Sequence, residues 1–111
     1  MSDHLTVDVS VADAPDRSRF EIRVDGETAG VAEYHRRPGV IAFMHTEIDA
    51  RFEGRGLAST LIQSALAEAR SAGESVLPFC PFVRSYIAGH DEYLDLVPNE
   101  MRARFRLTAD V

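Results

Sequence analysis

The chain of 111 residues carries a formal net charge of −6, with 18 acidic and 12 basic residues, and 45 % of its residues are hydrophobic. A chain of this length buries roughly two thirds of the surface of its unfolded form, which is enough for one hydrophobic core. We therefore expect a single soluble domain over residues 1–111. The acidic balance argues against a sequence-independent nucleic-acid binder, because such a protein needs a basic face to neutralise phosphates.

Three further classes are disfavoured by simple features. The apolar runs are only a few residues long, too short for a transmembrane helix. The first residues, Met1-Ser2-Asp3-His4, lack the basic and then apolar pattern of a secretory signal. Cys80 is the only cysteine, so an internal disulfide and a four-cysteine zinc site cannot form. We expect a cytoplasmic protein with no metal ion and with no membrane or nucleic-acid partner.

The first half of the chain is predicted to form an antiparallel meander. Its first two segments alternate apolar and polar residues, as half-buried strands do. Asp25-Gly26 is a hairpin signal and Pro38-Gly39 marks another turn. The fourth segment begins nearly all apolar, which indicates a central strand. The predicted strands cover residues 7–11, 20–24, 29–34 and 40–48, and residues with core character are Phe43, Met44 and, later in the chain, Phe79.

The second half is predicted to be a helical crossover followed by a parallel strand. Apolar residues recur at helical spacing from Leu57 to Ala69, and Gly73 ends the helix. Residues 75–79 form the next strand, with Pro78 near its end, and a short helix follows from residue 82 or 83 to 88. A strand, a helix and a strand in succession imply a right-handed connection and a parallel pair. The predicted fold class is α+β or α/β, with a mixed sheet, one long crossover helix and a short C-terminal helix.

One motif carries chemistry: Arg51-x-x-Gly54-x-Gly56, which lies between the fourth strand and the long helix. Glycines at these positions permit a tight turn and leave several N–H groups at the helix N-terminus pointing at one anion. The helix dipole adds to this attraction, so a diphosphate is a natural ligand, with Arg51 and Arg55 as supporting charges. Taken alone, two glycines beside a helix favour a simple tight loop.

The loop lacks the nucleotide triphosphatase pattern and the dinucleotide pattern of glycines. In its form and position it resembles the coenzyme A pyrophosphate loop of the GNAT superfamily of N-acetyltransferases. Over roughly residues 18–97 the chain resembles the small stand-alone YjdJ-type members in particular. The segments that carry this resemblance are His45-Thr46-Glu47-Ile48, Glu53-Gly54-Arg55-Gly56-Leu57-Ala58, Pro78-Phe79-Cys80-Pro81-Phe82-Val83, Tyr86-Ile87 and His90-x-x-Tyr93.

The resemblance implies a reduced GNAT-like fold that binds acetyl-coenzyme A. Larger members have two helices after the first strand, which help to form the acceptor pocket, and this chain lacks them. The backbone of Glu47 and Ile48 is expected to pair with the pantetheine arm. The residues expected at the diphosphate are Arg51, Phe52, Glu53, Gly54, Arg55, Gly56, Leu57 and Ala58.

Four side chains are candidates for acid–base or nucleophilic roles. His45 is a candidate general base, or else a histidine bonded to a neighbouring carbonyl. Glu47 could orient His45 or act through water, or else be a solvated carboxylate. Cys80 could form an acetyl-enzyme if His45 or the following helix activates it, or simply line the thioester site. The resemblance makes Tyr86 a general acid near the coenzyme sulfur, and its alternative is a packed aromatic.

The function predicted from these features is acetyl transfer from acetyl-coenzyme A to a primary amine, either a small amine or a protein lysine. The partners are then a small-molecule thioester and an amine acceptor, and an acidic chain attracts cationic amines. A non-catalytic acyl-coenzyme A binding or regulatory module is the alternative, motivated by the short chain. A generic nucleotide-binding domain is the third reading. The sequence makes no prediction of the oligomeric state.

Overall fold

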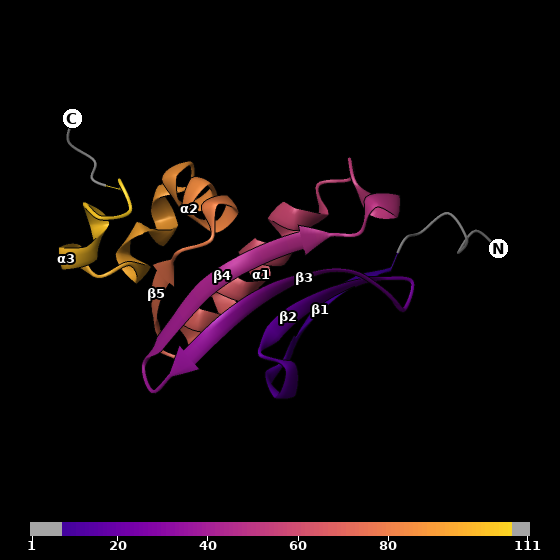
Figure 1. The fold of residues 1–111 in the computed structure, drawn as a ribbon, viewed down its shortest axis with the longest axis horizontal. Coiled ribbons are helices and arrows are strands. Elements are labelled where there is room, and N and C mark those ends of the chain that lie inside the picture. The colour runs from indigo at the N-terminus through magenta and orange to yellow at the C-terminus, as the bar shows by residue number, and fades with distance from the viewer. Residues whose placement is uncertain (1–7, 108–111) are drawn as a thin grey trace.

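A five-stranded sheet organises the computed structural model, which describes residues 8–107 (Figure 1). The strands lie in the order β1-β2-β3-β4-β5. The first four are antiparallel neighbours, and β5 pairs in parallel with β4, so the predicted meander and crossover are confirmed. The strands are β1 (Val9–Ala14), β2 (Arg19–Val24), β3 (Glu27–Arg37), β4 (Val40–Ile48) and β5 (Ser75–Pro78). Val7, the predicted start of the first strand, lies outside the described residues.

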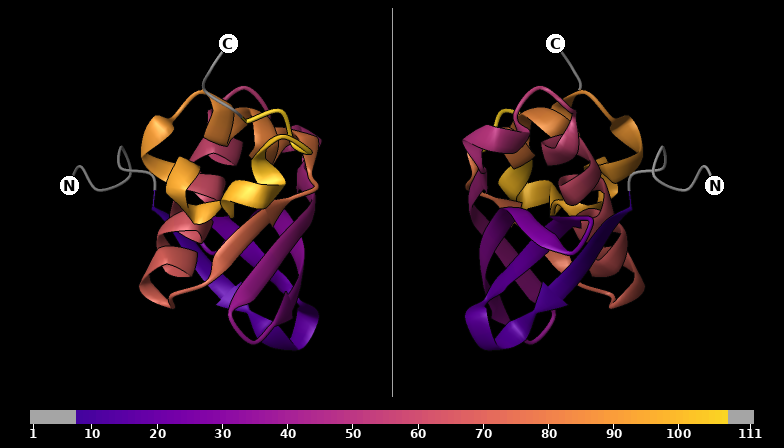
Figure 2. Two further views of the ribbon diagram at one scale, coloured as in Figure 1. Left: turned by 90° about the vertical axis from the view of Figure 1, so that its left-hand side faces the viewer. Right: turned by 90° about the vertical axis from the view of Figure 1, so that its right-hand side faces the viewer.

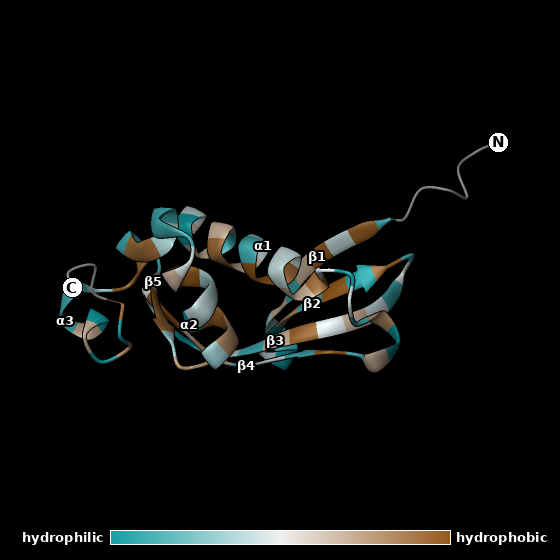
Figure 3. Ribbon diagram, turned by 90° about the horizontal axis from the view of Figure 1, so that it is seen from above, coloured by the Kyte–Doolittle hydropathy of each residue, from teal (hydrophilic) through white to brown (hydrophobic). Residues whose placement is uncertain are grey.

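The two main helices lie on one face of the sheet (Figures 2 and 3). The opposite face of β3 and β4 carries no helix in the described part of the chain, and we call it the open face. Within residues 8–107 no helix is long and apolar enough to cross a membrane. The helices are α1 (Leu57–Ser71), α2 (Pro81–Ala88) and α3 (Asn99–Arg102), with 3-10 segments at Pro15–Arg17, Ala50–Phe52 and Asp91–Leu96.

The core lies between α1, α2 and the sheet. Alternate residues of the strands point toward the helices, while α1 contributes residues at positions three and four apart. A full face of the long helix is thereby removed from water, which anchors it against β2 to β5. The largest fully buried side chains include Phe20, Ile22, Ile41, Phe43, Leu61, Ile62, Leu66, Val76, Val83 and Ile87.

A β-bulge interrupts β4 at Met44. Tyr34 of β3 pairs with Phe43, whereas Glu33 pairs with His45, so Met44 is an extra residue without a partner. Phe43 is 1 % exposed, as predicted, but Met44 is 40 % exposed, and its predicted place in the core is wrong. The reason is the alternation of β4: Phe43 points to the helices, so Met44 points to the open face, and the bulge then brings His45 to that face as well.

A buried carboxylate lies on the open face of β2. Glu21 is only 3 % exposed, because Arg17, Arg19 and Arg23 surround it with three charge-assisted hydrogen bonds of 2.9 to 3.1 Å. The hydrogen bond from Arg23, together with those from Arg19 and Arg17, lowers the pKa of Glu21 from 4.5 to about 2, although burial acts in the opposite direction. The three arginine side chains thus shield the Glu21 carboxylate from solvent on a face of the sheet that no described helix covers.

Candidate active site

The loop between β4 and α1 is shaped by its glycines. After the 3-10 turn at Ala50–Phe52, the chain passes through Gly54 and Gly56, which have φ angles of +85° and +73°. These left-handed conformations are costly for other residues. Gly56 is the N-cap of α1, so the sharp turn ends where the helix begins.

The first turn of α1 presents free backbone donors to a cavity of about 390 Å³. The N–H groups of Leu57, Ala58 and Ser59 have no acceptor within the helix, and none is found for them among the described residues. Together with the dipole of a 15-residue helix, they favour an anion at this point. The cavity is lined by Ile48, Phe52, Glu53, Gly54, Gly56, Leu57, Ala58, Ser59 and Phe82.

The two arginines of the loop differ in their partners. The Arg51 guanidinium lies 2.7 Å from Glu27 and 3.2 Å from Asp49, and its hydrogen bonds lower the pKa of Asp49. Arg55 has neither a hydrogen bond nor an ion pair among the described residues and lies over the Phe52 ring at 5.3 Å. Arg55 is therefore the arginine that is free to meet a diphosphate, while Arg51 stabilises the loop.

Strands β4 and β5 part next to this cavity. Their pairing ends at Phe43 and Pro78, and the Cys80 N–H donates to the Phe43 carbonyl at 2.8 Å. Beyond this point no described strand pairs with that edge of β4, which leaves backbone groups up to Ile48 open to an extended ligand. Glu47 and Ile48, the residues expected to pair with pantetheine, both lie on this free stretch.

Cys80 occupies the parting point on the helix side. Its side chain is buried, its Sγ lies 3.3 Å from the Thr46 hydroxyl, and it is the N-cap of α2. The helix begins at Pro81 rather than at residue 82 or 83, because proline suits a first helical position. Cys80 is therefore held at a helix N-terminus, with a hydroxyl as its neighbour.

His45 and Glu47 lie on the other side of β4. Thr46 faces Cys80, and successive residues of a strand point to opposite faces, so His45 and Glu47 point to the open face. His45 Nε2 lies 3.3 Å from Glu47 Oε1, as the two-residue spacing predicts for neighbours on one face. Both side chains are exposed. The structure thus places His45 beside Glu47 and not beside Cys80.

Tyr86 packs within an aromatic cluster on α2. Its ring stacks on His90 at a centroid distance of 4.0 Å, and the His90 Nδ1 lies 2.7 Å from the Tyr86 carbonyl oxygen. Burial, followed by the nearby Tyr93 and Glu92, raises the pKa of the Tyr86 phenol. Phe82 lies four residues earlier, on the same face of the helix, and lines the cavity at the loop. Tyr86 therefore lies one helical turn beyond Phe82 on that face of α2, outside the lining of the cavity.

Two lining residues were not among the predicted ones. Ser59 belongs to the first turn of α1, and extending the predicted loop by one residue would have included it. Phe82 is a large apolar side chain that is 37 % exposed, in the first turn of α2. The sequence analysis named Phe82 only within a segment that carries the resemblance, and its place at the cavity depends on how α2 packs beside the first turn of α1, which the structure shows.

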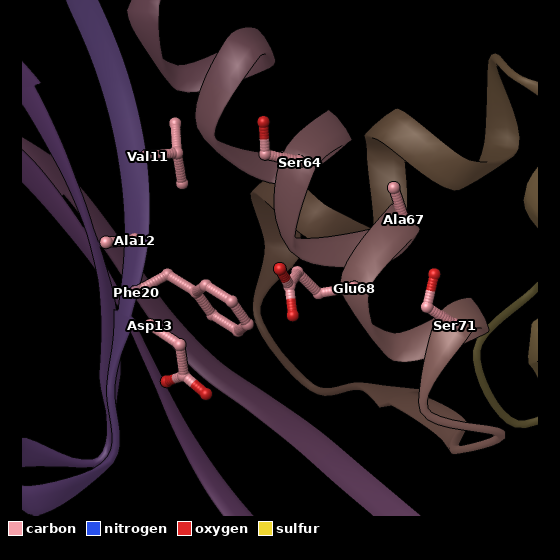
Figure 4. Close-up of a pocket in the computed structure, with 8 residues that line it drawn as sticks. All are labelled: Val11, Ala12, Asp13, Phe20, Ser64, Ala67, Glu68 and Ser71. Carbon is pink, nitrogen blue, oxygen red and sulfur yellow. The ribbon is translucent and has the colours of Figure 1, made fainter.

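Another cavity, of about 280 Å³, lies between β1 and α1 (Figure 4). Asp13 and Glu68 face it from opposite sides, with Phe20 between them. Asp13 is already engaged, because the Tyr34 hydroxyl donates to it at 2.5 Å and Arg36 at 2.9 Å. This cavity lies on β1, away from the free edge of β4, and contains none of the predicted site residues.

Comparisons with known proteins give the family and the fold of this chain. No curated protein matches the sequence. A ribosomal-protein-alanine N-acetyltransferase from Brucella melitensis biovar Abortus 2308 has a similar structure, with a TM-score of 0.50 and 18 % identity over 84 % of this chain and 92 % of that chain. At this identity the likeness shows a shared fold. The family model described as GCN5-related N-acetyl-transferase matches residues 19–96. The chain therefore belongs to the GCN5-related N-acetyltransferase family, and it is an acetyltransferase domain.

Proposed function

We propose that this protein is a small YjdJ-type acetyltransferase of the cytoplasm, which transfers the acetyl group of acetyl-coenzyme A to a primary amine. The observation that carries the proposal is the combination of free N–H groups at Leu57, Ala58 and Ser59 with the unpaired edge of β4 beside them. The first feature suits a diphosphate and the second suits an extended amide chain. Coenzyme A contains both groups in one molecule.

The arrangement predicts the side from which each reactant approaches. A chain paired with β4 from Ile48 toward Met44 brings a thioester to the point where β4 and β5 part. His45 and Glu47 lie there on the open face, so the amine approaches from that face. The amine nitrogen forms a bond to the acetyl carbon, the carbon–sulfur bond breaks, and the amine proton passes to His45, directly or through water. The departing thiolate takes its proton from Tyr86.

The first experiment measures binding and turnover separately. Calorimetric titration with coenzyme A tests binding at the β4–α1 loop and the edge of β4. Release of free thiol from acetyl-coenzyme A with a panel of amines tests the acetyl transfer. Binding without any amine-dependent thiol release, unchanged in the His45→Ala and Cys80→Ala variants, would favour the non-catalytic binding module. Equal stabilisation by ATP or NAD would favour a generic nucleotide-binding domain instead.

We expect direct transfer rather than an acetyl-cysteine intermediate. The Cys80 thiol is buried against the Thr46 hydroxyl, and His45 points to the opposite face of β4, so no base lies beside the thiol. Cys80→Ala is expected to keep turnover within about a hundredfold of the parent, the loss that a misplacement of the thioester by about 1 Å can cause. Steady-state thiol release by both proteins measures this ratio.

Mass spectrometry can also test whether Cys80 becomes acetylated, because of the composition of the chain. The chain contains no lysine, because all 12 of its basic residues are arginines. The intact protein treated with acetyl-coenzyme A in the absence of an amine therefore has few nucleophiles that could compete with Cys80. An acetylated species that forms rapidly, and only when Cys80 is present, would contradict direct transfer.

A further inference from the structure

A cavity that differs from the two described above lies on the open face of the sheet, with a volume of about 450 Å³. That volume is within the range of small-molecule sites. The lining side chains come from β3, β4 and β5 and from the residue after β5, and we call this surface the open-face groove. Its members are His35, Arg37, Val40, Ala42, Met44, Leu77 and Phe79.

The sheet register gives the groove a direction. Arg37 lies opposite Val40 near the β3–β4 turn, and Ala42 lies opposite Leu77 in the middle. Met44 lies at the other end, directly before His45, where β4 and β5 part. One end of the groove therefore reaches the point where a thioester would be placed, on the face opposite to the cavity at the β4–α1 loop.

The two ends of the groove differ in charge. Five apolar side chains form most of its lining, and the far end is cationic because of Arg37, while His35 lies opposite Ala42 in the middle. Within the described residues Arg37 forms no hydrogen bond or ion pair, whereas its neighbour Arg36 is held by Asp13 and Glu74. The near end leads instead to His45 and the carboxylate of Glu47.

From this pattern we propose that the acceptor is an ω-amino carboxylate, a primary amine joined to a carboxylate by an apolar spacer. The amine lies at His45, the spacer lies on Ala42 and Leu77, and the carboxylate binds Arg37. At about 3.3 Å per residue, Val40 and Met44 are roughly 13 Å apart, which an arginine side chain and a spacer of several methylenes together cover. This inference rests on the proposed function and specifies its substrate class, with Arg37 as the residue that determines specificity.

The test compares three amines of equal length: ε-aminocaproate, hexylamine and hexamethylenediamine. We expect kcat/KM for ε-aminocaproate to exceed the other two by about tenfold, because only this amine forms a charge-assisted pair with Arg37. Arg37→Gln should raise KM for ε-aminocaproate about tenfold, with little change in kcat and no change for hexylamine. Arg17→Gln is the matched control, because Arg17 is also an exposed arginine but lies at Glu21, away from the groove.

The outcomes separate the two proposals. Equal kcat/KM values for ε-aminocaproate and hexylamine, or a preference that survives Arg37→Gln, would overturn the assignment of the acceptor and leave the acetyltransferase intact. A higher kcat/KM for the diamine would also overturn it, since it would show that the groove selects a second cation. Absence of turnover with these three amines, together with turnover of another amine of the panel, would overturn the acceptor class alone. Absence of turnover with the whole panel, despite coenzyme A binding, would reject both proposals.

Discussion

Replacement of Gly56 by valine is expected to weaken coenzyme A binding at least about tenfold, a loss of about 1.4 kcal/mol. Gly56 has a φ angle of +73°, and a left-handed conformation costs other residues about 1–2 kcal/mol, more for a β-branched side chain. Open space surrounds the position, so the added side chain meets no neighbour and the strain acts on the backbone. The loop relieves this strain by turning, which misaligns the N–H groups of Leu57 and Ala58. Calorimetric titration with coenzyme A measures the change.

Gly26→Val is the matched control for this experiment. Gly26 has a φ angle of +85° in the β2–β3 turn, and it also has open space around it. Its replacement should lower the melting temperature by an amount similar to Gly56→Val, with no effect on the affinity for coenzyme A. Equal affinities in the two variants would show that the β4–α1 loop does not hold the diphosphate.

Glu21→Gln is expected to destabilise the fold by about 2 kcal/mol. Removal of one partner from a buried ion pair typically costs about 3–5 kcal/mol, and the partial exposure of the three arginines reduces this cost. In a domain of this size the change lowers the melting temperature by about 10 °C. Denaturant unfolding at neutral pH measures it. Glu33→Gln is the control on the neighbouring strand, and its effect should stay within about 0.5 kcal/mol.

The pH dependence of stability provides a second measurement on Glu21. Its pKa is lowered from 4.5 to about 2, so the folded state binds fewer protons than the unfolded state between these values. The contribution of ionised Glu21 to the free energy of unfolding is therefore complete above pH 4.5 and is lost as the pH falls toward about 2. The difference in unfolding free energy between the parent and Glu21→Gln should shrink over that window. A difference that stays constant down to pH 2 would contradict the role of the arginines.

The periodicity of the sequence predicted most of the fold, because its signals are local. The alternation around Phe20 and the helical repeat from Leu57 each depend on neighbouring residues alone, and both gave the correct element. The exposure of Met44 was missed because an apolar run does not show which of its residues face the helices. The bulge depends on the pairing of β3 with β4, which no local pattern reports, so the face on which His45 lies was hidden as well.

The candidate site was predictable to the extent that it is contiguous. Seven of its cavity-lining residues lie between Ile48 and Ala58, where a single motif indicates them. The separation of His45 from Cys80 was not predictable, because it depends on which face of β4 each residue occupies. The burial of Glu21 was equally hidden, since one of its three arginines comes from the 3-10 turn before β2.

The free edge of β4 has a consequence for how the protein behaves at high concentration. An unpaired strand edge is a template for another chain, and exposed edges of this kind promote aggregation. In this fold the unpaired stretch of β4 does not lie on an outer strand of the sheet. It lies between β4 and β5, beyond the point where their pairing ends. Whatever molecule occupies that stretch also removes the template. We therefore expect coenzyme A, which we propose to pair with these backbone groups, to reduce self-association of the protein as well.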